Sequence, residues 1–155
     1  MNQEPIKISD SEWEVMRVIW NEKCSDAKGI YDVLGVAKNW KMATIKTLLG
    51  RLVKKGALST EQEGKKFLYR PLVNEMQVIQ DATTELLAHI CAKKMGQTIS
   101  EMLSQVELTE KDIQEINEQL AKKKPVKIIK CDCLPGQCDC HKNERGNENE
   151  TNICN

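Results

Sequence analysis

Residues 41–56 read KMATIKTLLGRLVKKG, and this stretch is the most informative part of the sequence. Its branched apolar residues recur at helical spacing and make one stripe. That stripe consists of Ile45, Leu48, Leu49 and Leu52. At about 100° per residue, the opposite side is basic and hydroxylated, with small residues between. That side consists of Ala43, Lys46, Thr47, Gly50, Arg51 and Lys54. A helix of this kind, ending at Gly56, can enter a major groove while its Lys and Arg side chains reach phosphates or guanine edges.

Two further helical patterns precede this stretch. The first begins at Ser9 or Asp10, either of which can cap it. Its buried stripe consists of Trp13, Met16, Ile19 and Trp20. The second pattern runs from about Ala27 to Leu34, with Asp26 as its N-cap and Gly35 as its C-cap. The sequence therefore predicts three helices before residue 57.

Two strand-like runs follow the third helix. Residues 57–60 and 66–69 are β-prone, and the connection at 61–65 contains Gly64 as a turn residue. Three helices and a β-hairpin predict a winged helix-turn-helix, within a fold that is mainly α with a small β-hairpin. Lys65 and Lys66 at the tip of the hairpin would then contact phosphate.

The formal net charge of the chain is zero, but its distribution is uneven. No acidic residue occurs between Asp32 and Glu61. The basic residues in that interval are Lys38, Lys41, Lys46, Arg51, Lys54 and Lys55. A local basic stretch in a neutral chain indicates one surface that faces a polyanion, and the alternative is a solvated lysine-rich face.

The chain after residue 72 contains three more amphipathic patterns. They predict a helix from about Asn74 to Lys94 that ends at Gly96, and a short helix over Thr98–Gln105. A third helix starts at a capping box made by Thr109 and Asp112 and ends near residue 124. The apolar faces of these helices need cover, and a second copy of the chain is the simplest source. The alternative is a monomer in which the helices pack back on the winged helix.

Four cysteines lie together in the run CDCLPGQCDC at residues 131–140. They are Cys131, Cys133, Cys138 and Cys140. A disulfide between cysteines one residue apart is strained, and Pro135-Gly136 predicts a turn that folds the second pair onto the first. Thiolates suit Zn(II) and Cu(I). Zinc would take all four thiolates, whereas the tight C-x-C pairing leans toward Cu(I). A disulfide hairpin or free thiols are the alternatives. Residues 126–130 before the motif are strand-like.

The remaining cysteines and the tail complete the organisation. Cys24 and Cys91, in or beside helical patterns, are interpreted as buried small hydrophobes rather than ligands. His141 directly follows the motif and is interpreted as a solvated residue, with a place in the metal shell as the alternative. The role of Cys154 stays open. The sequence shows neither the apolar core of a signal peptide nor a membrane span, which predicts a cytoplasmic protein without a membrane partner.

These patterns predict four segments along the chain. A winged helix-turn-helix DNA-binding domain occupies 1–72, and a helical dimerisation region occupies 73–124. A Cys-rich metal-binding hook follows at 125–140. The polar residues 141–155 are expected to form a disordered tail.

The sequences ISDSEWEVM at 8–16, TIKTLLGRLVKKGAL at 44–58 and YRPLV at 69–73 resemble the BlaI/MecI family of winged-helix repressors. The C-x-C-x4-C-x-C motif is similar to that of its CopY branch, the copper-responsive repressors of Gram-positive bacteria. The resemblance extends from Ile8 to Cys140. The antibiotic-resistance branch is inactivated by cleavage at an Asn-Phe bond, whereas Leu103–Val106 reads LSQV here, which favours a metal switch.

This resemblance implies a homodimer on an inverted-repeat, double-stranded DNA operator. It implies repression in the zinc-loaded or copper-poor state and release when Cu(I) replaces Zn(II) at the four motif cysteines. A copper-donating protein is a further candidate partner. Carried over by position, the residues in the DNA-reading part of the third helix are Lys41, Ala43, Thr44, Lys46 and Thr47.

Other classes of function make different demands. A cytoplasmic protein that buffers copper or zinc would bind metal without sequence-specific DNA binding. A redox regulator would use the same cysteines to form disulfides. An enzyme is disfavoured, because the chain has only two histidines and a filled four-thiolate site leaves no open coordination position.

Overall fold

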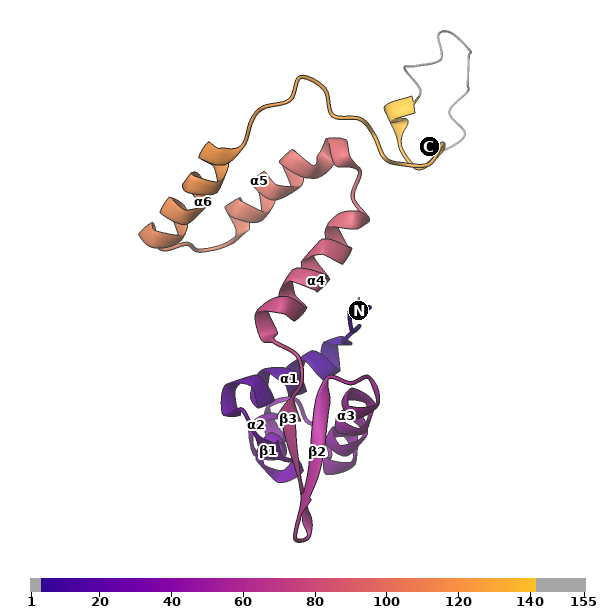
Figure 1. Ribbon diagram of the computed structural model, residues 1–155, viewed down its shortest axis with the longest axis vertical. Helices are drawn as coiled ribbons and strands as arrows, with labels where there is room; N and C mark the ends of the chain where they lie inside the picture. The colour runs from indigo at the N-terminus through magenta and orange to yellow at the C-terminus, as the bar shows by residue number, and fades with distance from the viewer. Residues whose placement is uncertain (1–3, 142–155) are drawn as a thin grey trace. The chain divides into compact units, whose positions relative to one another are not determined.

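The computed structural model describes residues 4–141 (Figure 1). The chain divides into two compact units, Met1–Glu85 and Leu86–Asn155, which are described separately below. Helices and a small antiparallel sheet build the first unit, and the described part of the second contains helices followed by an irregular segment at 123–138. None of the helices described is both long and apolar enough to cross a membrane.

The first unit begins with α1 (Asp10–Glu22), α2 (Ala27–Ala37) and α3 (Met42–Lys54). A capping box fixes the start of α1, because Ser9 N–H donates to Glu12 and Glu12 N–H donates to the Ser9 hydroxyl. These bonds confirm that the first helix begins where the sequence predicts.

The second helix starts as predicted but ends later. Asp26 is its N-cap, and its carboxylate accepts the N–H of Gly29 at 2.8 Å. The predicted C-cap at Gly35 is wrong, because α2 continues to Ala37 and Lys38 follows as the cap. Gly35 instead lies buried against the ring of Tyr31, where an added Cβ would be 2.6 Å from two ring carbons. The glycine is therefore required by close packing inside the helix.

The sheet contains β1 (Ser25–Asp26), β2 (Leu58–Glu63) and β3 (Lys66–Pro71), in the order β1-β3-β2. Both neighbouring pairs are antiparallel. The two-residue strand β1 was not predicted, because so short a segment carries no alternating pattern.

The hairpin has longer arms than the sequence indicates. Pairing runs from Leu58 opposite Pro71 to Glu63 opposite Lys66, so the predicted five-residue connection shrinks to two residues. Gly64 takes a φ of 63° in that loop, a conformation that glycine adopts without a Cβ penalty. The loop end of the hairpin projects beyond the helices (Figure 1).

The core of the first unit joins its three helices to the start of β2. Its fully buried large side chains include Met16, Ile19, Ile30, Ile45, Leu49, Leu52 and Leu58. This confirms the apolar stripe predicted for α3. Trp13 and Trp20 are half-buried and meet edge to face, with ring centroids 6.3 Å apart. The Trp20 indole N–H also donates to the Val73 carbonyl at 2.9 Å.

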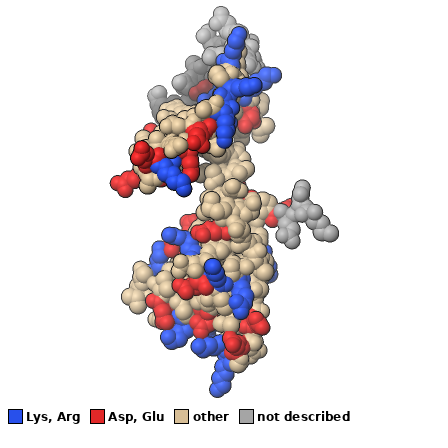
Figure 2. All heavy atoms as spheres, turned by 60° about the vertical axis from the view of Figure 1, so that its left-hand side comes forward, with Lys and Arg blue, Asp and Glu red and all other residues tan. Residues whose placement is uncertain are grey.

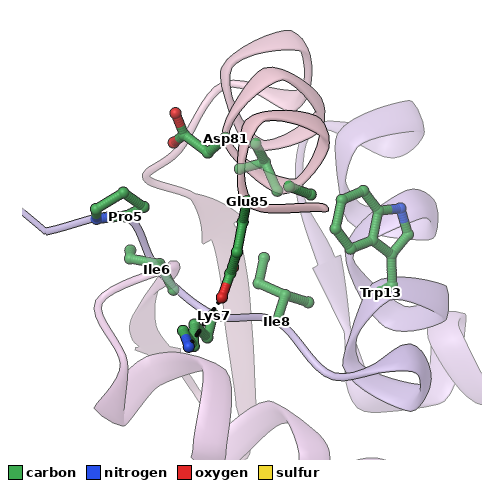
Figure 3. A pocket seen from close by; sticks show the side chains of 9 residues that line it. Pro5, Ile6, Lys7, Ile8, Trp13, Asp81 and Glu85 are labelled. Carbon is green, nitrogen blue, oxygen red and sulfur yellow. Dashed lines mark ion pairs between the residues drawn. The ribbon is translucent and has the colours of Figure 1, made fainter. Parts of the chain in front are cut away.

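Helix α4 (Glu75–Ala88) starts in the first unit and leads the chain into the second. Val78 on this helix is buried, and Lys7 forms an ion pair with Glu85 at 2.9 Å. Figure 3 shows Lys7 and Glu85 at a hollow that Pro5, Ile6 and Ile8 of the N-terminal segment also line. The hollow has a volume of about 190 Å³. The Lys7 side chain is largely exposed. The hollow therefore marks where the N-terminal segment packs on α4 and offers no enclosed ligand site.

The second unit contains the 3-10 turn η1 (Ala92–Lys94), α5 (Met95–Gln105), α6 (Glu110–Lys122) and η2 (Asp139–His141). The prediction of one helix to Lys94 is wrong, because α4 ends at Ala88. The predicted stop at Gly96 is also wrong, because α5 includes that residue.

The predicted start of α6 is confirmed, whereas the strand predicted after this helix does not form in the part of the chain that the structure describes. Thr109 and Asp112 form the expected capping box at the start of α6. The predicted strand at residues 126–130 is absent from the described chain. Val126 and Ile128 are instead 68% and 81% exposed, because no neighbouring strand pairs with this segment among the described residues.

Candidate nucleic-acid interface and metal centre

The outer face of α3 presents the residues that the sequence singled out. Each of the predicted DNA-contacting side chains on this helix is exposed: Lys41, Ala43, Thr44, Lys46, Thr47, Arg51 and Lys54. The apolar side chains on the opposite face of α3 are buried in the core, and this packing fixes the position of the exposed face. The Thr47 hydroxyl donates to the Ala43 carbonyl at 3.0 Å, which leaves its oxygen free to accept a further hydrogen bond.

The N-terminal end of α3 has properties that suit an anion. Lys41 is the N-cap, with φ −86° and ψ 156°, and it provides no side-chain cap bond. The first N–H groups of the helix therefore lack a side-chain acceptor there, and the helix dipole adds partial positive charge. Lys41 lies at this end, and the exposed Lys46 follows five residues later on the helix. This end of the helix is chemically matched to a phosphate.

The hairpin places its two lysines in different environments. Lys65 lies exposed in the two-residue loop at the tip. Lys66 forms an ion pair with Asp26 at 3.3 Å. The pKa of Asp26 is lowered, first by the Gly29 N–H and then by Lys66. A phosphate would therefore compete with Asp26 for Lys66, whereas Lys65 stands at the tip itself.

Charge on the first unit is mixed. Figure 2 shows Lys and Arg side chains interspersed with Asp and Glu on the face that it displays. A surface of alternating sign does not bind a polyanion strongly over its whole area. Any DNA contact by this unit is therefore expected first at α3, which contains no acidic residue, whereas Glu63 directly precedes the loop that holds Lys65.

A second group of functional side chains lies in the second unit, at the cysteine motif. The predicted turn between the two Cys-x-Cys pairs is confirmed, because Gln137 N–H donates to the Leu134 carbonyl at 3.0 Å. The Gln137 side chain accepts the Leu134 N–H at 2.8 Å, and Gly136 takes a φ of 92°. The turn brings Cys138 back to Cys131, with the two Sγ atoms 3.3 Å apart.

Cys91 joins this cluster, and the sequence interpretation of it must be corrected. It is buried, as expected, but its Sγ lies 3.6 Å from that of Cys131 and 3.8 Å from that of Cys140. Sequence reasoning missed this contact because a helical pattern surrounds Cys91 and forty residues separate it from Cys131. A cysteine interrupting that pattern was the available signal.

Two overlapping sets of donor atoms result. One set is Cys91, Cys131, Cys138 and Cys140, and the other is Cys91, Cys131, Asp132 and Cys133. Within each set the donor atoms lie within 4.8 Å of one another. Sulfur-rich sets of this kind match soft ions such as Zn(II) and Cu(I) and poorly match Mg(II) or Ca(II). The residues present therefore fit the metals that the sequence predicts.

Hydrogen bonds among the thiols separate their pKa values. The Cys131 thiol lowers the pKa of Cys138 to about 6, with help from the Cys140 N–H. The pKa of Cys140 rises to about 12, chiefly because its thiol donates to Cys138. The pKa of Cys133 is also raised, first by its hydrogen bond with Cys91. Cys138 therefore carries thiolate charge at neutral pH, which favours a cation nearby.

The other residues considered from the sequence belong to neither donor set or lie outside the description. Cys24 is a half-buried free thiol in the first unit. His141 ends η2, and its side chain is outside the description. Cys154 and the rest of the predicted tail after His141 also lie outside the described residues.

The chain is similar to known proteins over most of its length. The family model described as penicillinase repressor matches residues 8–122. An uncharacterized 16.5 kDa protein encoded in the ptsI 3' region of Latilactobacillus sakei is 43% identical over 141 residues, which is 89% of this chain and 96% of that protein. The penicillinase repressor of Bacillus licheniformis is 31% identical over 118 residues, or 76% of this chain and 92% of that protein.

Two solved structures are similar to a part of the chain. A CopR repressor structure is 51% identical and covers 44% of this chain and 99% of its own, with a TM-score of 0.39. The DNA-binding domain of the repressor BlaI is 39% identical and covers 48% of this chain and 90% of its own, with a TM-score of 0.44.

Proposed function

Because the chain belongs to the penicillinase repressor family, we propose that it is a copper-responsive transcriptional repressor. The main observation in support of this proposal is that one chain contains both a thiol cluster and the DNA-reading unit of this repressor family. The family match ends at residue 122, and the motif cysteines begin at Cys131. The part of the chain beyond the shared region therefore supplies all the donor atoms of both sets except the Cys91 sulfur, and the shared region supplies the DNA reader.

In this proposal the outer face of α3 enters the major groove of an inverted-repeat operator. Ala43, Thr44 and Thr47 are small enough to let the helix approach base edges. The phosphate contacts are assigned to Lys41, Lys46, Arg51, Lys54, Lys65 and Lys66. Phosphate contacts set the position and the salt dependence of binding, whereas base contacts set its specificity. A repressor of this kind works in the cytoplasm, where bacterial DNA lies.

The repressor would act as a homodimer. The helices after residue 72 leave many large apolar side chains partly or mostly exposed, including Met76, Leu86, Ile99, Met102, Ile113 and Leu120. A second copy of the chain would cover such surfaces, and a two-fold protein matches a two-fold operator.

The cluster would be the sensor. Zn(II) bound by motif thiolates maintains repression, and Cu(I) replaces it and lowers operator affinity. The four cysteines assigned are Cys131, Cys133, Cys138 and Cys140. Zinc and copper(I) prefer different coordination, so exchange changes the geometry of the cluster. A tenfold loss of DNA affinity requires only about 1.4 kcal/mol of coupling between the two sites.

Fluorescence anisotropy tests this proposal directly. A labelled inverted-repeat DNA, selected by the protein from a random pool, is bound at fixed salt by zinc-loaded protein and then titrated with Cu(I). We expect tight binding that is lost as copper enters and zinc is released. A Cys131→Ser, Cys133→Ser double variant is expected to bind the same DNA and to ignore copper. If copper releases this variant normally, the hook is not the sensor.

A second candidate function is cytoplasmic buffering of copper or zinc. It is favoured by one observation, namely that all the clustered thiols belong to the second unit, separate from the DNA reader. The buffer would bind metal and show no sequence-specific DNA binding in any metal state. The same anisotropy measurement therefore separates the two functions.

A further inference from the structure

Cys91 precedes the cysteine motif by forty residues, yet its sulfur lies among the motif sulfurs. We infer that Cys91 is a metal ligand and binds zinc together with Cys131, Cys138 and Cys140. The inference rests on the proposed function, because it adds a ligand to the same metal site. It also changes the expected ligand set, in which Cys133 would otherwise hold the fourth position.

The distances between the sulfur atoms support this set. In a tetrahedral site with Zn–S bonds of about 2.3 Å, neighbouring sulfurs lie about 3.8 Å apart. Cys91 Sγ is 3.6 Å from Cys131 Sγ and 3.8 Å from Cys140 Sγ. The Cys131 and Cys138 sulfurs are closer, at 3.3 Å. Two edges of the tetrahedron that involve Cys91 are therefore close to the required length, and a third needs a small expansion.

The position of Cys133 follows from the same geometry. Cys91 and Cys131 belong to both sets of donor atoms, whereas Cys133 belongs only to the set that contains the Asp132 carboxylate. The all-sulfur set is the better match for a closed zinc site, because structural zinc sites favour Cys and His ligands. Zinc therefore takes Cys91 in preference to Cys133.

The helix ends shortly before Cys91, and this end sets the backbone conformation of Cys91. Helix α4 stops at Ala88, and the His89 and Ile90 N–H groups form i→i−3 hydrogen bonds, both 3.1 Å long, that close the last turn. Cys91 then takes φ −52° and ψ 131°, outside the helical region. A continuous helix, as the periodicity predicts, would not give Cys91 this backbone conformation. In this inference the break in the helix allows the Cys91 thiol to lie among the motif thiols.

A second contact joins the same two segments. The Asp132 carboxylate accepts the Ala92 N–H at 3.0 Å, and Ala92 is the first residue of η1. A residue between two motif cysteines therefore caps the turn that follows Cys91. Bond formation to an ion by Cys91 would strengthen a junction that the polar contact already makes.

This ligand gives the metal a route to the helices. An ion held by the motif alone would order residues 131–140 and nothing else. An ion that also holds Cys91 closes the chain between residues 91 and 131, and so fixes the segment between α4 and α5. A change from zinc to copper then acts on a segment that lies within the proposed dimerisation region, between α4 and α5.

Zinc affinity of single variants of the full chain tests the assignment. Cys91→Ser, Cys133→Ser and Cys24→Ser are compared by competition with a chromophoric zinc chelator, with Cys24 as a thiol outside both donor sets. We expect Cys91→Ser to weaken zinc at least tenfold, Cys133→Ser to weaken it less than Cys91→Ser does, and Cys24→Ser to leave it unchanged. The Co(II)-substituted Cys91→Ser variant should lose about a quarter of the sulfur-to-cobalt absorption, since one of four thiolates is gone.

Thiol labelling of the unaltered protein avoids any effect of substitution on folding. Cysteines are labelled with N-ethylmaleimide with and without one equivalent of zinc and located by mass spectrometry. Zinc-dependent protection of Cys91, with Cys24 unaffected, is the expected result. Two results would overturn the inference and leave the proposed function standing. One is equal labelling of Cys91 with and without zinc. The other is unchanged zinc affinity in Cys91→Ser together with lost zinc affinity in Cys133→Ser. Failure of the unaltered protein to bind zinc or Cu(I) overturns both.

Discussion

At the scale of single residues, Glu12 shows how one side chain serves several elements. It is 2% exposed, completes the capping box of α1 and forms an ion pair with Lys55 after α3. Burial raises the pKa of Glu12, but hydrogen bonds from Lys55 and Ser9 outweigh burial and hold the pKa below its usual value. A buried carboxylate of this kind stabilises the fold only while its partners are present.

Glu12→Gln is expected to lower the free energy of unfolding by about 1–3 kcal/mol at pH 7, because the Lys55 ammonium loses its carboxylate partner and keeps only the Lys7 carbonyl. A carboxylate whose pKa is lower in the folded than in the unfolded protein stabilises the fold at pH values above its unfolded-state pKa. That stabilisation is lost as the pH falls through the folded-state pKa. The variant should therefore show a flatter loss of stability below about pH 4.5 in urea titrations.

The matched control is Glu14→Gln, which removes an ion pair with Lys38 of 3.2 Å that is much more exposed. That change should cost less than about 1 kcal/mol. If both variants lose the same free energy of unfolding, then the burial of Glu12 does not make its ion pair more stabilising than an exposed one.

The thiol cluster gives a second prediction at this scale. In metal-free protein, iodoacetamide should modify Cys138 first, with a rate that rises through a midpoint near pH 6, because the pKa of Cys138 is about 6. Cys140 should resist until much higher pH, because its pKa is about 12. Mass spectrometry after short pulses measures both rates in one sample. A shared midpoint for the two cysteines would contradict the hydrogen-bond order described above.

At the scale of the elements, α3 contains a glycine that its own stability does not require. Gly50 is exposed within the helix, and an added Cβ there would meet nothing within 4 Å. Gly50→Ala should raise the free energy of unfolding by about 0.5–1 kcal/mol. If the helix lies deep in the groove, the same methyl group should weaken operator binding by about 5-fold to 150-fold, a crowding cost of about 1–3 kcal/mol.

Gly96→Ala provides the control for this prediction. Gly96 lies in α5, and its added Cβ would also meet nothing within 4 Å. Its operator affinity, measured by anisotropy beside Gly50→Ala, should equal that of the unaltered protein. Unchanged operator affinity in Gly50→Ala would mean that this face of α3 does not approach DNA closely.

The elements also show what sequence can and cannot predict. The stripe of α3 and the caps at Ser9, Asp26 and Thr109 were predictable, because periodicity and capping are local properties. The extension of α2 past Gly35 was not, because it depends on how the Tyr31 ring packs.

The same limit applies to the candidate metal centre. The motif and its turn were visible in ten consecutive residues. Cys91 was not, because the break before it is explained by contacts with Cys131 and Asp132, forty residues away. Tertiary contacts of this kind override helical periodicity, and a single sequence gives no measure of them.

At the scale of the whole molecule, the exposed apolar residues of α6 predict a dimer that can be broken by one substitution. Ile113 is 48% exposed. In a two-fold interface every substitution acts twice, so Ile113→Glu places two charges where two apolar side chains were buried. Each lost side chain costs about 1.5–3 kcal/mol, so the dimer should weaken by more than a hundredfold. Sedimentation velocity should show a dimer for the unaltered protein and a monomer for the variant.

The variant also separates dimerisation from DNA reading. Ile113→Glu should lose most of its affinity for the full inverted repeat and keep that for a half-site, because the winged helix is a separate compact unit. Gln114→Glu adds the same charge on the neighbouring exposed position and should change neither property. A monomeric unaltered protein, or equal effects of the two substitutions, would contradict an interface at Ile113. If Ile113→Glu alone loses the dimer and the full repeat, then the operator is read by two copies held together through these helices. Copper can then release the DNA by altering that pairing, without touching α3 itself.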